Sequence, residues 1–195
     1  MNTKYEFTGE TKIVYGRTLR RIKAIVAIGA TVAPGDIGGW IESENNLSVC
    51  GNAWVYGNAE VYGNAKVYGN ALVCGNAKVY GNAKVYGNAL VYGDAKVYDK
   101  ARVSGNARVF GNANVSSDAE VHSNADYMTF KNSWSSGRWF TYTASNKKWS
   151  VGCFYGTGDE LVRKAYSDSE LSGKCYEAIV RAVEAIEAAK GSGVK

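Results

Sequence analysis

Residues 61–84, VYGNAKVYGNALVCGNAKVYGNAK, belong to a tract that decides the fold of this chain. One six-residue word, Val-Tyr-Gly-Asn-Ala-x, is written thirteen times in register between Val49 and Asp126. Val fills the first position and Ala the fifth in every copy, whereas the second and sixth positions vary widely. A period this strict indicates a repeat architecture, so we interpret it before any other feature of the sequence.

Each position of the word has a physical role in a coil. Ala-x-Val-Tyr is a short strand, whose alternation turns Ala and Val to one side and x and Tyr to the other. Gly-Asn is a corner, because Gly accepts positive φ without steric cost and Asn tolerates the left-handed region. Three corners close a triangle of about eighteen residues. The repeat therefore predicts a parallel β-helix with stacked Val and Ala inside.

The word also resembles the hexapeptide repeat of the left-handed parallel β-helix, in which an aliphatic residue, variable positions and a small residue alternate. The resemblance covers residues 49–126 and implies a mainly β protein built on a triangular prism. A disordered low-complexity tract is the alternative, but disorder does not require Val at every sixth place.

The segment before the repeat is rich in β-branched residues. Residues 4–8 and 11–28 are expected to form short strands that cap the first coil, since an uncovered coil end exposes unpaired backbone groups. Residues 32–48 drift into the six-residue register, with Asn46-Leu47 in the Asn-Ala slot. We therefore expect residues 1–48 to form an N-terminal β cap and an irregular first coil.

A second module follows the repeat, at residues 127–195. Residues 127–131, 137–144 and 147–154 are typical of three strands joined by Ser- and Asn-rich turns, and predict a meander. Thr157 and Glu160 have the spacing of a capping box, so a helix is expected over 159–166. A second helix is expected over 173–190, with Gly191 as its stop and an apolar stripe of Tyr176, Ile179, Val180, Val183 and Ile186.

Four stretches carry a further resemblance: GRTLRRIKA (16–24), GDIGGWIESENNLS (35–48), GNAWVYGNA (51–59) and WSVGCFYGTGDEL (149–161). They resemble a group of small β-helical proteins encoded by bacteriophages and prophages. The resemblance implies a phage setting, the β-helix and a C-terminal α+β module. It implies no particular activity.

The outward positions of the repeat separate into three faces, because words three apart stack. Two faces carry ladders of lysine beside ladders of tyrosine, which is typical of a solvated β surface. The other face is apolar, and such a patch usually marks an interface. We expect either other protomers of a homotrimer or the C-terminal helix of the same chain to cover it. The interface residues we predict are Trp54, Tyr56, Leu72, Leu90, Tyr92 and Phe110.

Composition narrows the functional classes. The net charge of +5 is too mild to indicate duplex nucleic acid, though it permits an anionic small ligand. No apolar run reaches the length of a membrane span and the N-terminus has no signal-peptide core, so a cytoplasmic protein is expected. The four cysteines lack metal-binding spacing, and we expect free thiols, no metal and no cofactor.

No catalytic constellation is visible in the sequence. Acyltransferases with hexapeptide repeats use a histidine general base between two prisms, often beside an inserted loop. His122 is the only histidine here, it lies in the last coil, and no loop interrupts the words. Gly156-Thr157-Gly158 before a helix can bind an anion through the helix N-terminus, or can simply be a capped helix after a strand.

The strongest functional cluster is aromatic and basic, and it lies in the C-terminal module. Stacking surfaces with interleaved positive charge suit a nucleobase and its phosphate. The candidate ligand-binding residues are Lys131, Trp134, Arg138, Tyr142, Lys147 and Lys148. Alternation places Arg138, Phe140 and Tyr142 on one side of their strand and Trp139 on the other, and we assign Trp139 to the core.

These observations favour a non-enzymatic binding protein of phage origin. It would act in the cytosol of the host cell by sequestering a nucleotide-like signal or a host defence protein. An acyltransferase of the hexapeptide type and a structural virion component are the alternatives.

Overall fold

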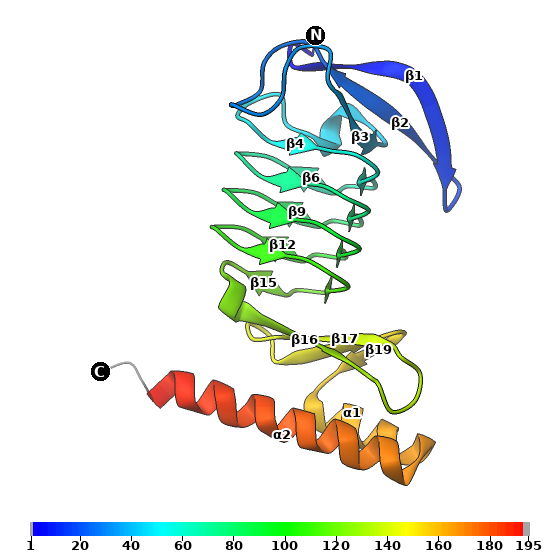
Figure 1. Ribbon diagram of the computed structural model, residues 1–195, viewed down its shortest axis with the longest axis vertical. Helices are drawn as coiled ribbons and strands as arrows, with labels where there is room; N and C mark the ends of the chain where they lie inside the picture. Colours follow the sequence, from blue (N-terminus) through cyan, green and yellow to red (C-terminus); the bar gives the residue numbers. More distant parts are fainter. Residues whose placement is uncertain (1, 193–195) are drawn as a thin grey trace. The chain divides into compact units, whose positions relative to one another are not determined.

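The computed structural model describes residues 2–192, and the chain divides into two compact units, residues 1–126 and 127–195. The first unit is a parallel β-solenoid of nearly five turns preceded by a β-hairpin, and the second is an antiparallel sheet with two helices (Figure 1). The prediction of a mainly β protein built on a parallel β-helix is confirmed.

The solenoid strands lie in three parallel sheets, and Figure 1 shows β6, β9, β12 and β15 stacked one above another. Word positions eighteen residues apart pair in register, as in Lys66 with Lys84. The first sheet contains β3 (Ile37–Ile41), β5 (Glu60–Val61), β8 (Lys78–Val79), β11 (Lys96–Val97) and β14 (Asn114–Val115). The second contains β4 (Trp54–Val55), β7 (Leu72–Val73), β10 (Leu90–Val91) and β13 (Arg108–Val109). The third contains β6 (Lys66–Val67), β9 (Lys84–Val85), β12 (Arg102–Val103) and β15 (Glu120–Val121).

The interior of the solenoid consists of the fixed positions of the word. Every Val from Val55 to Val121 and every Ala from Ala53 to Ala119 is completely buried. Backbone amides join successive coils, as where Lys66 N donates to Ala83 O at 2.9 Å and Tyr68 N donates to Val85 O at 3.1 Å. The buried Val and Ala side chains form one apolar core along the twelve strands β4–β15. Burial of each Val side chain stabilises the fold by about 1.5–3 kcal/mol.

At the Gly-Asn corners, the two residues have different roles, whereas the prediction let both take the left-handed conformation. Glycine takes the positive φ, for example 69° at Gly63, and a Cβ there would lie 3.1 Å from the carbonyl oxygen of Gly81. Asn does not use the left-handed region. Its side chain instead forms ladders along the corner, as where Asn70 Nδ2 donates to Asn88 Oδ1 at 3.1 Å.

The two terminal words depart from the regular coil, and here the prediction that Val and Ala point inward throughout residues 49–126 is wrong. Leu47 is fully buried and forms the bridge to Val67, while Val49 is 46% exposed. The cause is a short turn at residues 43–46, in which Asn46 Nδ2 donates to the carbonyl oxygens of Gly63 and Ala65, both at 2.9 Å. At the other end of the repeat Ala125 is exposed.

The N-terminal segment forms one long hairpin rather than several short strands. β1 (Tyr5–Val14) pairs antiparallel with β2 (Arg17–Ala24), and β2 pairs with β3 at the edge of the first solenoid sheet. Figure 1 shows the hairpin running along the side of the coils. It is tied there by Lys12, whose Nζ lies 2.7 Å from Glu60 Oε1, and Glu60 also pairs with Lys78 at 2.8 Å.

The C-terminal unit has a four-stranded antiparallel sheet with the order β16 (Tyr127–Lys131), β17 (Trp139–Thr143), β18 (Lys148–Val151) and β19 (Phe154–Gly156). The prediction of three strands is therefore corrected. Gly152, with φ of 57°, turns the chain and divides the expected strand 147–154 into β18 and the start of β19.

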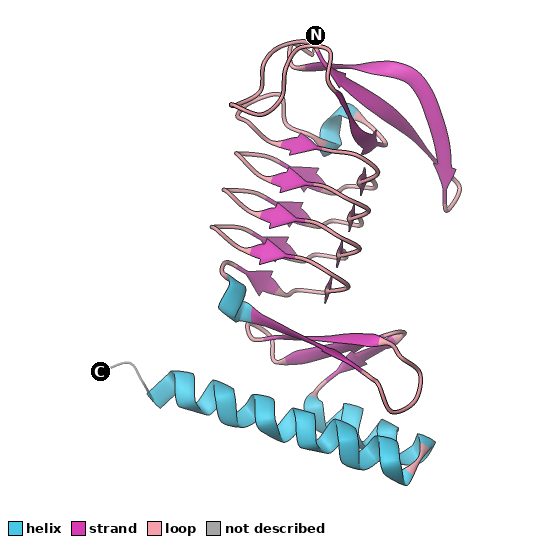
Figure 2. Cartoon of the chain, viewed as in Figure 1, coloured by secondary structure: helices cyan, strands magenta, loops and turns pink. Residues whose placement is uncertain are grey.

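Two helices cover one face of this sheet (Figure 2). α1 (Gly158–Asp168) begins at the predicted capping box, where the side chain of Thr157 accepts from Glu160 N and that of Glu160 accepts from Thr157 N. α2 (Glu170–Ser192) starts earlier than predicted and continues through Gly191, which does not end it. Ile186 is exposed, whereas the core joins the sheet to the helices through Phe140, Tyr142, Trp149, Leu161, Val162, Ala165, Tyr176, Val180 and Val183.

Candidate ligand-binding cavity of the C-terminal unit

Of the two aromatic residues expected to stack on a ligand, Tyr142 belongs to the core of the C-terminal unit and Trp134 is half-buried against that core. Tyr142 is only 5% exposed and packs on Trp149, with ring centroids 5.1 Å apart. Trp134 meets Tyr176 edge to face at 5.1 Å. Burial corrects the assignment of Tyr142 as a stacking residue, whereas that of Trp134 stays a prediction.

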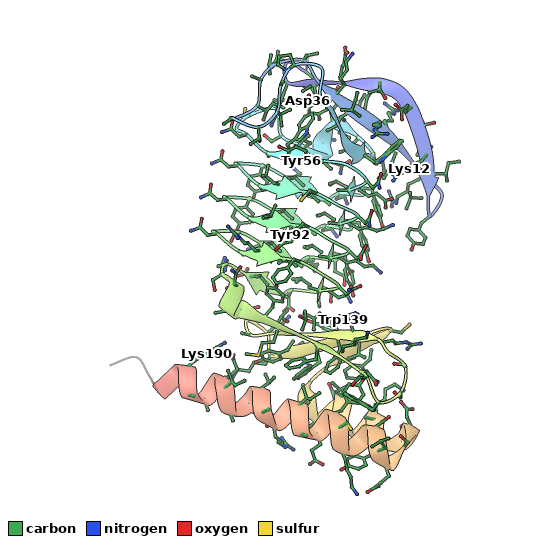
Figure 3. The ribbon with its side chains drawn as sticks, in the orientation of Figure 1. Lys12, Asp36, Tyr56, Tyr92, Trp139 and Lys190 are labelled. Atoms are coloured by element: carbon green, nitrogen blue, oxygen red, sulfur yellow. The ribbon has the colours of Figure 1, made fainter. Side chains whose placement is uncertain are left out.

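Trp139 was predicted to lie in the core, and this prediction is wrong, because its side chain is 38% exposed. Phe140 and Tyr142 turn toward the helices, so alternation along β17 places Trp139 on the other face of the sheet. Trp139 is labelled on the sheet in Figure 3, and Lys131 Nζ lies 6.0 Å from the centre of its ring. The two residues form an exposed cation–π pair.

Arg138 is the one predicted ligand-binding residue that lines a cavity between the sheet and the two helices of this unit. The cavity has a volume of about 360 Å³ and is formed by the loop after β16, the β18–β19 hairpin and both helices. Its apolar walls include Phe154 and Leu161, and its polar lining includes Ser136, Lys164 and Tyr176.

The polar floor of this cavity is fixed by Asn132, which is buried. Asn132 Nδ2 donates to Ser135 Oγ at 2.9 Å and to Tyr176 Oη at 3.1 Å, while Asn132 Oδ1 accepts from Ser135 N at 2.9 Å. These bonds tie the loop after β16 to α2. The cavity is therefore preformed by hydrogen bonds that need no ligand.

The charges around the cavity favour an anion. In the part of the chain that the structure describes, neither the Arg138 guanidinium nor the Lys164 ammonium has a hydrogen-bond or ion-pair partner. Arg138 lies against the β18–β19 turn, where a Cβ on Gly152 would be 3.1 Å from Arg138 Nη1. Asp168 also lines the cavity, so its lining contains two cationic side chains and one anionic side chain and carries a net positive charge.

The remaining predicted residues do not join this site. Tyr142 and Lys147 line a different cavity of about 400 Å³, together with Trp149, Glu184 and Glu187. Burial raises the pKa of Tyr142, and Glu187 and Glu184 raise it further. That cavity has an acidic rim and is unsuited to an anion. Lys148 is half-buried and alternates with Trp149, so it lies on the face of the sheet away from the helices.

The solenoid places His122 in a small polar cluster that the sequence did not reveal. His122 Nδ1 lies 2.6 Å from Ser104 Oγ, and its Nε2 lies 3.5 Å from Glu120 Oε2. Glu120 also pairs with Arg102 at 3.1 Å. Ser104 is only 4% exposed, so its hydroxyl group is enclosed by its neighbours and does not face an open site.

The apolar face of the solenoid is the second sheet. Most of the predicted interface residues have at least partly exposed side chains on this face. Trp54 is an exception: it is 0% exposed and belongs to the core. Leu72, Leu90 and Tyr92 are half-buried, and Tyr56 Oη lies 2.9 Å from Thr31 Oγ1. Phe110 is 49% exposed and stacks on Tyr92, which is labelled in Figure 3, with ring centroids 5.3 Å apart.

Residues 2–192 contain no group of three or more His, Cys, Asp or Glu side chains arranged to hold a metal ion. The four cysteines are free thiols. Neither α1 nor α2 is long and apolar enough to cross a membrane.

Stacked coils of parallel two-residue strands with a Val and Ala interior define a β-helix repeat protein. A family model for the YdcK β-solenoid repeat matches residues 83–99 and 101–117, a stretch that contains β9 to β14. A comparison with curated proteins found no match. The family match therefore supports the repeat architecture and leaves the activity open.

Proposed function

We propose that this chain is a non-enzymatic binding protein, in which the C-terminal unit holds a small anionic ligand in the Arg138–Lys164 cavity. The observation that carries the proposal is a preformed cavity with two unpaired cations at its wall. An unpaired guanidinium gains about 1.5–3 kcal/mol from a charged hydrogen bond.

A nucleotide-like molecule fits the chemistry of the cavity. Its volume of about 360 Å³ lies in the range of small-molecule sites. Phe154 and Leu161 offer apolar surface to a base, while Arg138 and Lys164 offer charge to a phosphate. Lys164 and Phe154 thus take the roles that the sequence had suggested for Lys147 and Trp134.

The biological setting follows from the resemblance of the N-terminal and C-terminal motifs to phage-encoded β-helical proteins with hexapeptide repeats. A phage protein that sequesters a nucleotide-like signal in the host cytosol would blunt a host defence that depends on that signal. We further propose a homotrimer assembled through Leu72, Leu90, Tyr92 and Phe110. Such a trimer would present three C-terminal units, each with its own cavity.

Native mass spectrometry after incubation with cell extract tests the proposal directly, because a retained nucleotide would add its mass to each chain. Calorimetry with mono-, di- and cyclic nucleotides then gives the affinity. Arg138→Ala should weaken binding at least tenfold, whereas Arg163→Ala is the matched control on α1, since its Nε bonds to Asp159 O outside the cavity.

Three results would overturn this proposal. No heat with any nucleotide and no retained mass would direct attention to a host protein, to be captured by pull-down. Turnover of acetyl-CoA would identify an acyltransferase. Recovery of the chain from purified phage particles would identify a virion component.

A further inference from the structure

A third cavity lies on the solenoid, where its first coil departs from the repeat. It has a volume of about 600 Å³ and is lined by Leu47, Val49, Lys66, Tyr68 and Lys84, with Glu44 at one side. It exists because Leu47, not Val49, takes the inward place beside Val67. Residues 48–50 therefore bulge outward above the third sheet of the solenoid.

The bulge is held by buried groups and is not a loose loop. Lys4 Nζ, on a buried side chain, donates to Ser48 O at 2.9 Å. Tyr5 Oη donates to Leu47 O at 3.1 Å. Both donors come from the start of the N-terminal hairpin, so the upper wall of the cavity is fixed by the fold of the first unit.

One wall of the cavity is the first ring of an aromatic ladder. Tyr68 stacks on Tyr86 with centroids 4.9 Å apart and an interplanar angle of 1°. The residue one coil earlier in this column is Ser48, which follows Leu47 and donates its backbone amide to Val67 O, so no aromatic side chain precedes Tyr68 in the ladder. A flat ring in the cavity can therefore add a rung on Tyr68, at the spacing that the ladder already has.

Two lysines line the cavity together with Tyr68. Lys66 and Lys84 occupy the same word position on paired strands and are both exposed. Within residues 2–192 neither ammonium has an ion-pair or hydrogen-bond partner, whereas Arg102, next in the column, pairs with Glu120. Their strands are neighbours, about 4.8 Å apart, so the two like charges repel each other, and one anion placed between them relieves that repulsion. Glu44 offsets part of this charge.

We propose that this cavity binds a small planar aromatic anion, with its ring on Tyr68 and its anionic group between Lys66 and Lys84. The site lies in the solenoid and does not depend on the function proposed for the C-terminal unit. Recognition needs both the ring and the charge of the ligand, because Tyr68 lies two residues after Lys66 on the same outer face and Lys84 lies on the neighbouring strand β9.

Naphthalene sulfonate is a suitable probe, because it joins a flat ring to a fixed negative charge. Titration of the full chain, followed by calorimetry and by the fluorescence of the probe, should show saturable binding. Methanesulfonate, which lacks the ring, and naphthalene methanol, which lacks the charge, should each bind at least tenfold more weakly. Binding of either control probe as tightly as naphthalene sulfonate would overturn the proposal, as would no binding of naphthalene sulfonate.

Variants locate the site. Lys66→Gln and Lys84→Gln should each weaken binding about tenfold, while Lys96→Gln, an exposed lysine at the same word position on the first sheet, should not. Tyr68→Leu should weaken binding about fivefold or more through lost stacking. All four residues lie on the outside of the coil, and thermal melts will verify that each variant is folded. An unchanged affinity in Lys66→Gln and Lys84→Gln would refute the site, and a loss only in Arg138→Ala would assign the probe to the C-terminal cavity.

Discussion

The rings of Tyr5 and Trp54 meet edge to face with their centroids 6.3 Å apart, and both side chains are buried. Tyr5, from the N-terminal hairpin, thus covers Trp54, the first outward residue of the apolar solenoid face. The backbone of Gly38 closes the site from another side, where a Cβ would lie 2.8 Å from the indole. Trp54 therefore stabilises the cap within one chain.

Trp54→Ala should lower the free energy of unfolding by about 3–5 kcal/mol, the usual cost of truncating a large buried aromatic side chain. Chemical denaturation measures this change, and light scattering should find the same oligomeric state as in the wild type. A variant with wild-type stability that dissociates would instead place Trp54 in an interface between chains.

Val85→Asp should unfold the middle coils of the solenoid, because it puts an unpaired charge between completely buried Val side chains. Circular dichroism and a thermal melt would record the loss of β structure. Lys96→Asp is the matched control, since this side chain is exposed at an outward word position, and it should melt close to the wild type. A soluble Val85→Asp protein with an unchanged melting temperature would contradict the inward position of Val.

Leu72→Lys combined with Leu90→Lys should dissociate the proposed trimer into folded monomers. The two residues pair across β7 and β10 and are half-buried, so lysines there face solvent in a monomer but are desolvated in an interface. Light scattering reports the mass and circular dichroism the fold. A wild-type protein that is already monomeric would remove the interface from the proposal.

The repeat was predictable because every word meets the same neighbours as the next one. A Val such as Val85 always stacks on the Val one coil away, so local pattern and tertiary contact agree. This agreement ends at Val49, whose place is taken by Leu47. What decides that exchange is a turn fixed by Asn46 and a lysine and a tyrosine from the N-terminal hairpin, contacts that the six-residue period does not contain.

The C-terminal site was harder to predict, since both faces of β17 carry aromatic side chains. Alternation separates Trp139 from Phe140 but does not say which of them meets the helices. The cavity beside them also combines Arg138 with Lys164, which are far apart in the sequence and belong to different elements. Lys164 lies in an ordinary amphipathic helix, and nothing in its local sequence distinguishes it from Lys174.

Lys4 should make stability depend on pH in alkaline solution. Burial disfavours its ammonium and lowers its pKa from 10.5 to about 8, and the neighbouring Cys50 opposes this shift more weakly. Between these two pKa values the unfolded chain keeps the proton that the folded chain has lost. The unfolded state then binds more protons, so the contribution of Lys4 to stability rises with pH.

Urea unfolding of wild type and Lys4→Met at several pH values isolates this effect. The stability of the wild type relative to the variant should increase from about pH 8 to pH 10. The buried Tyr62, whose pKa is raised to about 12, acts only above that window and is present in both proteins. A difference that stays constant or decreases with pH would show that Lys4 is not held in a site that disfavours its charge.

The tryptophans Trp139 and Trp149 provide a matched pair for the C-terminal unit, because both lie in its sheet and only one faces the helices. Trp149 is buried between Phe140 and Tyr142, so Trp149→Ala should destabilise this unit by about 3–5 kcal/mol. Trp139→Ala removes an exposed ring beside Lys131 and should cost less than about 1 kcal/mol, the usual value of an exposed cation–π pair. Denaturation followed by far-ultraviolet circular dichroism of α1 and α2 measures both changes. Equal destabilisation by the two variants would mean that the two faces of the sheet are packed alike, contrary to the burial of Phe140 and Tyr142 on the helix side.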